Sequence, residues 1–121
     1  MKQGANYLSE RFKSIGFAIE GILVFIKTEA HAAIHAVATV FVIAVCFLYP
    51  VSFREIIALV TVTGMVWMAE LMNTAIEKTM NLLVPHKKPE VKFIKDVAAG
   101  AVLVAVATAV LVACIVFIPK I

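Results

Sequence analysis

The sequence predicts an all-α integral membrane protein, with an N-terminal amphipathic helix at the membrane interface followed by three transmembrane helices. The first observation behind this prediction is composition: of 121 residues, 63% are hydrophobic and 16% are charged, and the mean hydropathy is +1.01. A soluble domain of this size cannot bury so much apolar surface. The second observation is a set of three long apolar segments separated by proline-containing turns. We therefore expect a single membrane domain over residues 1–121.

The first 28 residues show the periodicity of an amphipathic helix. Apolar side chains recur at steps of three and four, and charged side chains occupy the other faces. The apolar residues are Leu8, Phe12, Ile15, Ile19, Ile22 and Ile26. A cleavable signal peptide is the competing interpretation, but Glu20 interrupts the apolar stretch and no small-residue cleavage site follows. The pattern therefore predicts an interfacial helix over residues 1–28.

The first two spans are predicted at residues 29–49 and 53–84. His31 to Tyr49 contains no formal charge when its histidines are neutral, and its length of about 19 residues is enough to cross a hydrocarbon core of about 30 Å. The second span is apolar from Ile56 to Ala69 and then continues in helical register past several polar residues. Its end is therefore expected to extend into the cytosol.

The third span is predicted at residues 91–118. Pro85 and Pro89 separate it from the second span, and Pro119 ends it. Small residues recur in it at four-residue spacing, which favours close helix packing in lipid. They are Ala101, Ala105, Ala109 and Ala113.

Basic residues predict the orientation in the membrane. Most of them precede the first span or surround the loop between the second and third spans, and only Arg54 and Lys120 lie on the other side. By the positive-inside rule, the N-terminus and the loop around Lys87 are cytoplasmic, while the turn at Pro50 and the C-terminus are external. The pI near 9.0 does not indicate nucleic-acid binding, because the basic residues flank apolar runs instead of alternating with aromatic residues.

Glu70 is the most informative residue, because a carboxylate inside an apolar span costs several kcal/mol on insertion scales. If the hydrocarbon core starts near Ile56, the helical rise places Glu70 about 21 Å across it and Glu77 about 32 Å across it. Glu77 then lies at the cytoplasmic interface, with Glu70 about 10 Å deeper. Asn73 lies between them, and offsets of three, four and seven residues put all three side chains on one stripe. They can therefore serve one site.

Two further acids, Glu29 and Asp96, open the first and third spans and are expected at the same membrane face as Glu77. Carboxylate oxygens suit Mg²⁺, and neighbouring lysines such as Lys95 can neutralise a polyphosphate, as phosphoryl transfer requires. The alternative interpretation of Glu29 and Asp96 is solvation of helix ends, where acids near an N-terminus are favoured by the macrodipole. Glu70 lies too deep for that alternative.

The depth of Glu70 suits a general base for a lipid alcohol, whose hydroxyl stays at headgroup depth while its chains remain in the hydrocarbon. A structural hydrogen bond or a proton relay is the alternative role. Intramembrane carboxylates also mark ion pathways, so a small ion-coupled membrane transporter or channel subunit is the alternative function. The lack of an internal inverted repeat in the three short spans argues against it.

Two segments resemble the signature of prokaryotic diacylglycerol kinases: AELMNTAIE at residues 69–77 and KDVAAGAVL at residues 95–103. The resemblance extends over nearly the whole chain, including Gly21 and Glu29. It implies a multi-pass lipid kinase of the bacterial cytoplasmic (inner) membrane that uses ATP and Mg²⁺ to phosphorylate a membrane lipid alcohol. It also implies a homotrimer whose sites form between neighbouring subunits.

The same resemblance implies roles for individual residues. Glu70 is similar to the family's catalytic base, and Glu29 and Glu77 to its metal ligands. The implied nucleotide-binding residues are Glu10, Phe17, Glu29, Asn73, Glu77, His86, Lys88, Lys95 and Asp96. The implied lipid-contact residues are Ser14, Ile15, Glu70 and Ala99.

The identity of the lipid is left open between diacylglycerol, which would give phosphatidic acid, and undecaprenol. Asn81 and His35 stand where the diacylglycerol-specific branch is expected to carry aspartate and glutamate. The pair Ile34-His35 and the C-terminal residues 118–121 look more like the branch that contains undecaprenol kinases.

Overall fold

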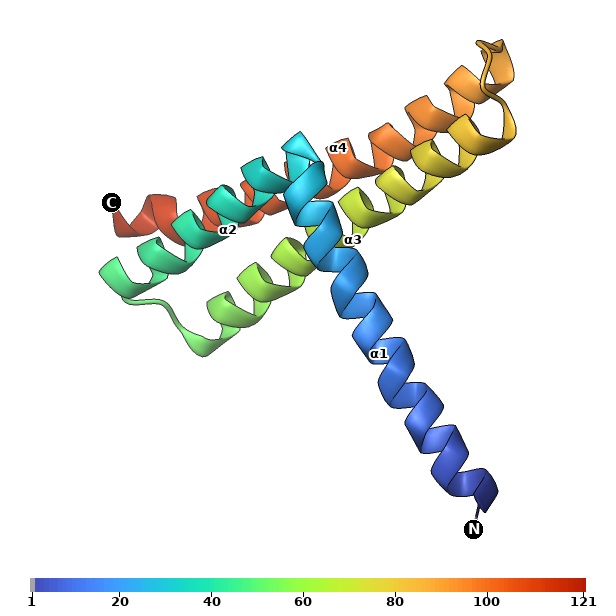
Figure 1. The fold of residues 1–121 in the computed structure, drawn as a ribbon. Helices are drawn as coiled ribbons and strands as arrows, with labels where there is room; N and C mark the ends of the chain where they lie inside the picture. The colour runs from blue at the N-terminus through green and yellow to red at the C-terminus, as the bar shows by residue number, and fades with distance from the viewer. Residues whose placement is uncertain (1) are drawn as a thin grey trace. The chain divides into compact units, whose positions relative to one another are not determined.

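The computed structural model describes residues 2–121 and is helical almost throughout, which confirms the predicted all-α class. Its elements, in chain order, are α1 (Lys2–Thr28), α2 (Ala30–Leu48), α3 (Phe53–Leu83), α4 (Pro89–Phe117) and a short 3₁₀ helix, η1 (Ile118–Lys120) (Figure 1). Met1, the first residue of the predicted 1–28 helix, lies outside the described residues. The chain divides within α2 into two compact units, residues 1–37 and 38–121.

Three stretches are long and apolar enough to cross a membrane: Ala30–Leu48, Phe53–Leu83 and Pro89–Lys120, with hydropathies of 2.2, 1.6 and 3.1. The three long helices within them begin and end within two residues of the ranges predicted from sequence. The largest difference is the start of α4, which begins at Pro89 and not at Val91. Proline is accommodated in the first turn of a helix because its φ angle is already helical. The N–H groups of a first turn have no acceptor within the helix, so the N–H that proline lacks costs no hydrogen bond there.

In the first unit, α1 is one continuous helix of 27 residues, and most of its side chains are exposed, including the predicted apolar face. Phe25 is its one buried side chain among the described residues. At the end of α1, Glu29 is a single non-helical residue whose N–H donates to the Phe25 carbonyl at 3.0 Å. Its own carbonyl accepts from the Ala32 N–H at 3.2 Å, so the chain passes from α1 to α2 at Glu29 without a longer loop.

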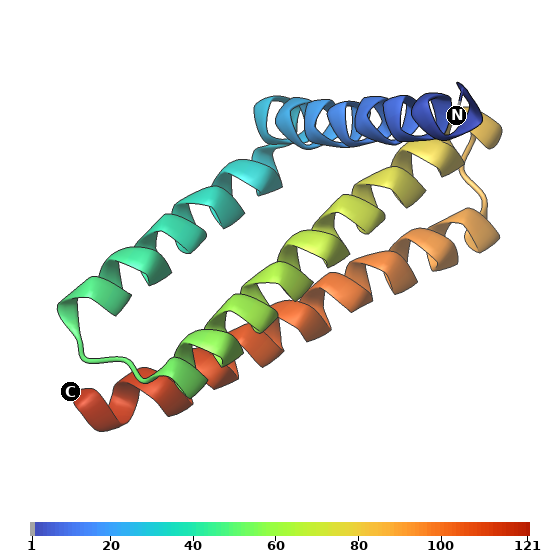
Figure 2. The same ribbon diagram turned by 90° about the horizontal axis from the view of Figure 1, so that it is seen from below.

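In the second unit, α3 and α4 form a long antiparallel hairpin, and the two views show them side by side along their length (Figures 1 and 2). On each helix the buried residues form a stripe with steps of three, four, seven or eleven residues. These residues are Leu59, Val62, Val66 and Glu70 on α3, and Val91, Ala98, Ala105 and Val116 on α4. A repeat close to 3.5 residues keeps one stripe facing the partner helix, which is the geometry of nearly aligned helix pairs.

The alanines at four-residue spacing do not form this buried stripe as a set. Ala105 is buried, but Ala101, one turn earlier, is exposed. Ala98, which is seven residues before Ala105, occupies the interface instead. Because an α-helix has about 3.6 residues per turn, side chains four residues apart rotate gradually around the helix axis. Only part of a stripe with this spacing can therefore face a neighbouring helix that is nearly parallel.

Two further contacts join elements within the second unit. The Trp67 indole N–H donates to the Thr39 hydroxyl at 2.9 Å and joins α3 to the second half of α2. At the end of the hairpin away from the α3–α4 loop, the Lys120 ammonium lies 3.0 Å from a Glu55 carboxylate oxygen. Glu55 also forms a capping box with Ser52, in which each residue accepts a backbone N–H of the other, so the start of α3 and the end of α4 are held together.

Candidate functional site

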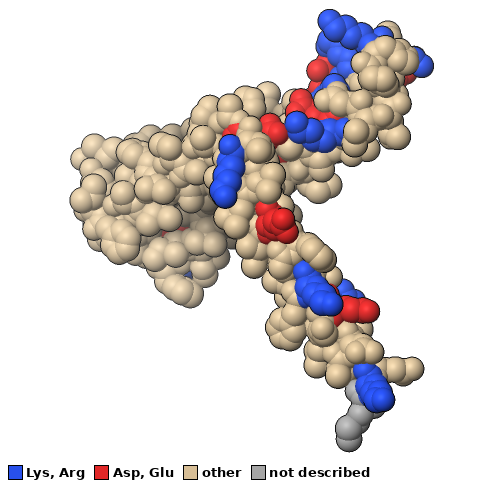
Figure 3. Space-filling model, in the orientation of Figure 1, with Lys and Arg blue, Asp and Glu red and all other residues tan. Residues whose placement is uncertain are grey.

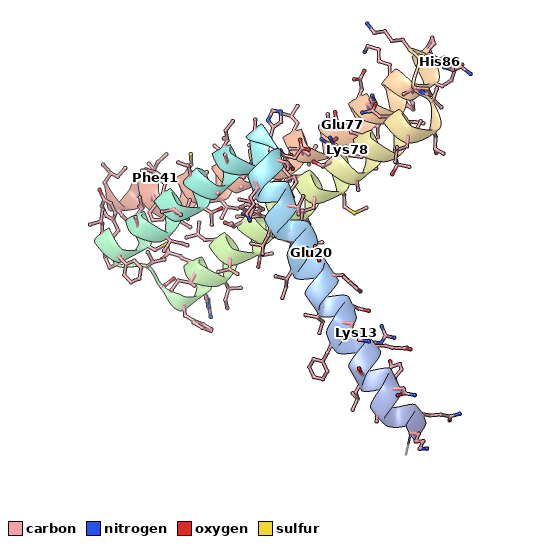
Figure 4. All side chains as sticks on the ribbon, viewed as in Figure 1. Lys13, Glu20, Phe41, Glu77, Lys78 and His86 are labelled. Carbon is pink, nitrogen blue, oxygen red and sulfur yellow. The ribbon has the colours of Figure 1, made fainter. Side chains whose placement is uncertain are left out.

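A groove of about 880 Å³ lies where α3 ends and α4 begins. Its lining residues are Glu77, Asn81, Val84, Pro85, His86, Lys87, Lys88, Pro89, Val91, Lys92, Lys95, Asp96 and Ala99. Glu77 and His86, which Figure 4 labels, belong to α3 and to the loop. On the face that Figure 3 shows, the charged side chains of the second unit gather at this end of the hairpin. Six residues predicted as site residues therefore meet in one groove: Glu77, His86, Lys88, Lys95, Asp96 and Ala99.

The local sequence explains why these residues meet. The helix α3 continues beyond its apolar part to Leu83, and the Val84 N–H closes it by donating to the Met80 carbonyl at 2.8 Å. The chain then needs only residues 84–88 before Pro89 starts α4. A connection this short places the last turns of one helix beside the first turns of the next.

The lysines of the groove are not explained by helix stability. Lys88 is the N-cap residue of α4, and Lys92 and Lys95 follow in its first two turns. The helix macrodipole disfavours cations at an N-terminus and favours anions there. Lysines and free backbone N–H groups together make a positive environment suited to phosphate.

Two contacts organise the charges in the groove. The Lys92 ammonium pairs with the Asp96 carboxylate at 2.5 Å, one helical turn along α4. The Lys95 ammonium reaches across to α3 and donates to the Asn81 side-chain carbonyl at 2.6 Å. The second contact joins the two helices that form the groove.

The stripe predicted on α3 passes from a buried to an exposed environment. Glu70 is buried, with 6% of its surface exposed, and Glu77 is exposed in the groove. Between them, the side-chain oxygen of Asn73 is buried and accepts no hydrogen bond from residues 2–121. A buried carbonyl oxygen without a donor is costly, so Asn73 presents an acceptor that a ligand donor or a cation could satisfy.

The remaining predicted residues belong to the first unit. Glu10, Ser14, Ile15 and Phe17 are exposed on α1, where the Ser14 hydroxyl donates to the Glu10 carbonyl at 3.0 Å. Glu29 is partly buried at the junction of α1 and α2. Their roles in nucleotide, metal or lipid binding stay predictions.

The donor chemistry of the second unit fits Mg²⁺ in its usual protein setting. Within residues 2–121, no three His, Cys, Asp or Glu side chains form a metal-binding group. Mg²⁺ commonly takes only one or two carboxylates and completes its coordination with water and substrate phosphates. The exposed Glu77 carboxylate and the unsatisfied Asn73 oxygen are hard donors of the kind that Mg²⁺ selects.

Asn81 is a groove residue that the sequence relates to the choice of lipid but for which it predicts no binding or catalytic role. It lies four residues after Glu77, so the helical period that grouped Glu70, Asn73 and Glu77 also places Asn81 on their stripe. That spacing could have identified it. The hydrogen bond from Lys95 could not be predicted in the same way, because it depends on how α4 is aligned against α3.

Comparisons with known proteins identify the family of this chain. The family model for prokaryotic diacylglycerol kinase matches residues 16–117. The undecaprenol kinase of Bacillus subtilis (strain 168) is 35% identical over 119 residues, which cover 98% of this chain and 97% of that protein. The chain, which has three candidate membrane spans, therefore belongs to the prokaryotic diacylglycerol kinase family and is a membrane lipid kinase.

Proposed function

We propose that this lipid kinase transfers the γ-phosphate of ATP, with Mg²⁺, to the hydroxyl of a membrane lipid alcohol, and that undecaprenol is the lipid. Undecaprenol is preferred to diacylglycerol because the relative that aligns over nearly the full length of both chains is an undecaprenol kinase. Diacylglycerol is the second substrate to be tested, since the family model carries its name.

The observation that carries the proposal is the burial of Glu70 in an apolar span, seven residues before the basic groove begins at Glu77. Seven residues of helix correspond to a rise of about 10 Å. A lipid hydroxyl at the depth of Glu70 and a polyphosphate in the groove can thus approach each other along one face of α3. The lipid chains remain in the hydrocarbon while the nucleotide stays in water.

In the proposed step, the lipid hydroxyl oxygen attacks the γ-phosphorus as the Glu70 carboxylate accepts the hydroxyl proton. The bond between the γ-phosphorus and its bridging oxygen breaks, and ADP leaves with that oxygen. The ammonium groups of Lys88 and Lys95 offset the phosphate charge. Glu77 and Glu29 would hold Mg²⁺, which when bound withdraws charge from the phosphate oxygens.

We extend the proposal to the surroundings of the site. The apolar side chains exposed on α1 support an interfacial position, with Ser14 and Ile15 beside the lipid and with Glu10 and Phe17 near the nucleotide. The lysines of the α3–α4 loop support a cytoplasmic location for the groove in a bacterial inner membrane. A homotrimer would let neighbouring subunits complete each site.

A kinase assay with γ-labelled ATP on undecaprenol and diacylglycerol, side by side in mixed micelles, tests the proposal. We expect transfer that requires Mg²⁺, with the higher kcat/KM on undecaprenol. Transfer that favours diacylglycerol would overturn the lipid choice, and a folded preparation that labels neither lipid would overturn the assigned reaction. Ion flux in proteoliposomes without nucleotide is the result that the transporter hypothesis requires.

A further inference from the structure

Trp67 is the one tryptophan of the chain, and it lies three residues before Glu70 on α3. Three residues of helix correspond to a rise of about 4.5 Å, and side chains at this spacing lie on the same side of a helix. The partly buried indole donates its N–H to the Thr39 hydroxyl of α2 at 2.9 Å. A large, flat side chain is therefore held between α2 and α3 within one helical turn of the proposed base.

This bridge stands at one end of an apolar groove of about 420 Å³, the α2–α3 groove, which is lined by the second half of α2 and the first half of α3. Thr39 is the first residue of its lining, and the lining residues of α3 lie between Ile56 and Thr63. These α3 residues precede Glu70 by seven to fourteen positions, which is about 10–21 Å along the helix. A hydrocarbon chain whose hydroxyl lies at Glu70 therefore passes the Trp67 indole before it reaches the α2–α3 groove.

The two candidate lipids differ most at the level of this bridge. Undecaprenol is a primary alcohol with a single isoprenoid chain, whereas diacylglycerol carries two ester-linked chains on the carbons next to its hydroxyl-bearing end. The volume of the α2–α3 groove is near the low end of the range of about 300–1,000 Å³ that is usual for ligand pockets. The groove therefore suits one chain, and the indole obstructs the wider glycerol ester.

We propose that Trp67, held by Thr39, is a specificity-determining residue: its indole narrows the path from Glu70 to the α2–α3 groove, so that an alcohol with one hydrocarbon chain is preferred to diacylglycerol. The inference rests on the proposed function, because it takes the lipid hydroxyl to lie at Glu70. It commits the α2–α3 groove to the chain of the lipid substrate. The width of the indole carries the role, since a hydrogen bond between membrane helices contributes little to stability.

The first test compares kcat/KM on undecaprenol and on diacylglycerol for Trp67→Leu, Thr39→Val and the unaltered enzyme. Trp67→Leu removes the wide ring, so the undecaprenol-to-diacylglycerol ratio of kcat/KM should fall about tenfold. Thr39→Val keeps the shape of residue 39 but releases the indole, so a fall of about threefold is expected. The KM for Mg-ATP should stay within about twofold in both variants, since the basic groove is unchanged. Each preparation is assayed on both lipids, so the fraction of folded enzyme cancels in the ratio.

Thr61→Val is the matched control for Thr39→Val. Thr61 is exposed on α3, its hydroxyl donates to the Ile57 carbonyl of its own helix at 2.7 Å, and it does not line the α2–α3 groove. Its substitution should leave the lipid ratio unchanged. A merely structural bridge predicts that Trp67→Leu and Thr39→Val lower the kcat/KM values on both lipids by the same factor. That result, or an equal shift of the ratio in Thr61→Val, would overturn the role of Trp67.

Because Trp67 is the one tryptophan, its fluorescence reports what occupies the α2–α3 groove without any turnover. The enzyme is reconstituted in bilayers of phosphatidylcholine with brominated acyl chains, whose bromine atoms quench a tryptophan that they contact. We expect quenching that undecaprenol relieves and that the same amount of dioleoylglycerol does not relieve. Quenching that undecaprenol leaves unchanged would exclude its chain from the groove. An indole that is not quenched before undecaprenol is added would be covered by protein, such as a second copy of the chain, and this too would overturn the proposal.

The two proposals fail in different ways. If the unaltered enzyme prefers undecaprenol and Trp67→Leu keeps the same lipid ratio, the role of Trp67 is wrong and the proposed function stands. If the unaltered, folded enzyme does not prefer undecaprenol, the lipid choice of the proposed function is wrong and the role of Trp67 falls with it.

Discussion

At the residue scale, Glu70 combines two properties that seldom occur together in a membrane helix. It carries an ionisable carboxyl group, and only 6% of its surface is exposed. An acid held at such depth is costly, so its presence between apolar residues of α3 needs a function that compensates for it. Proton acceptance from a lipid hydroxyl is the function that its position supports best.

We predict that Glu70→Gln lowers kcat for lipid phosphorylation about 10²- to 10⁴-fold, because the amide cannot accept the proton. The KM for Mg-ATP should change little, since the groove is left intact. Initial rates with labelled ATP at saturating lipid measure both values. Glu90→Gln is the matched control: Glu90 is an exposed carboxylate of the first turn of α4, outside the groove lining. Unreduced turnover in Glu70→Gln would exclude the role of base.

Glu77 calls for a different prediction, because it lies exposed in the groove beside the lysines. Glu77→Gln should raise the Mg²⁺ concentration for half-maximal activity by at least about tenfold, since a carboxylate ligand is lost. Excess Mg²⁺ should restore most of the turnover, which would not happen for Glu70→Gln. Activity measured against Mg²⁺ at fixed ATP distinguishes the two variants. An unchanged Mg²⁺ requirement would mean that Glu77 is not a ligand.

At the scale of elements, the α3–α4 hairpin sets the geometry of the groove. Its buried stripes run from the capping box and the Lys120–Glu55 ion pair at one end to the 84–88 loop at the other. Shifting α4 by one turn along α3 would move it about 5.4 Å. Such a shift would break the Lys95–Asn81 hydrogen bond and separate the lysines from Glu77. The packing of the hairpin is therefore a condition for the site.

The two alanines Ala105 and Ala101 give a matched test of this packing. Ala105→Leu should destabilise the hairpin by about 1–3 kcal/mol, because extra methylene groups overpack a buried position. Ala101→Leu introduces the same atoms one turn away at an exposed position and should have a much smaller effect. Thermal unfolding in detergent micelles, followed by circular dichroism, compares them. Equal destabilisation by both substitutions would contradict the buried stripe described for α4.

At the scale of the whole molecule, the two ends of the α3–α4 hairpin differ in charge. The loop and the first turns of α4 carry the four lysines of the groove, whereas the opposite end has Arg54 and a Lys120 that is paired with Glu55. Intracellular ATP can reach the groove only if the loop is cytoplasmic. The proposed orientation and the proposed reaction therefore depend on each other.

Labelling of single cysteines tests this orientation in spheroplasts of the expression host. Cys46 and Cys114 are first replaced by alanine, and Lys87→Cys or Arg54→Cys is then introduced. A membrane-impermeant maleimide should label residue 54 in intact spheroplasts and residue 87 only after permeabilisation. The reversed pattern would place the groove outside the cell and would rule out ATP as its substrate there.

The helices themselves could be predicted from the sequence alone. Hydropathy, periodicity and proline position are properties of neighbouring residues, so they place each helix within two residues of its observed bounds. They also identify Glu70, because a carboxylate in an apolar span is anomalous whatever surrounds it. The sequence predicts Pro89 in the loop, whereas the structure starts α4 there; proline both ends and begins helices, and only the course of the backbone distinguishes the two cases.

The tertiary structure decided the contacts between distant parts of the chain. Lys95 with Asn81 and Lys120 with Glu55 join residues 14 and 65 positions apart, and both pairs follow from the alignment of α4 against α3. The same alignment buries Ala98 and Ala105 and leaves Ala101 exposed. A local pattern cannot contain this information, because every face of an apolar membrane helix has a similar composition and the partner helix selects which face is buried. The sequence by itself determined the spans and the buried acid, and the packing of two of those spans determined the groove beside it.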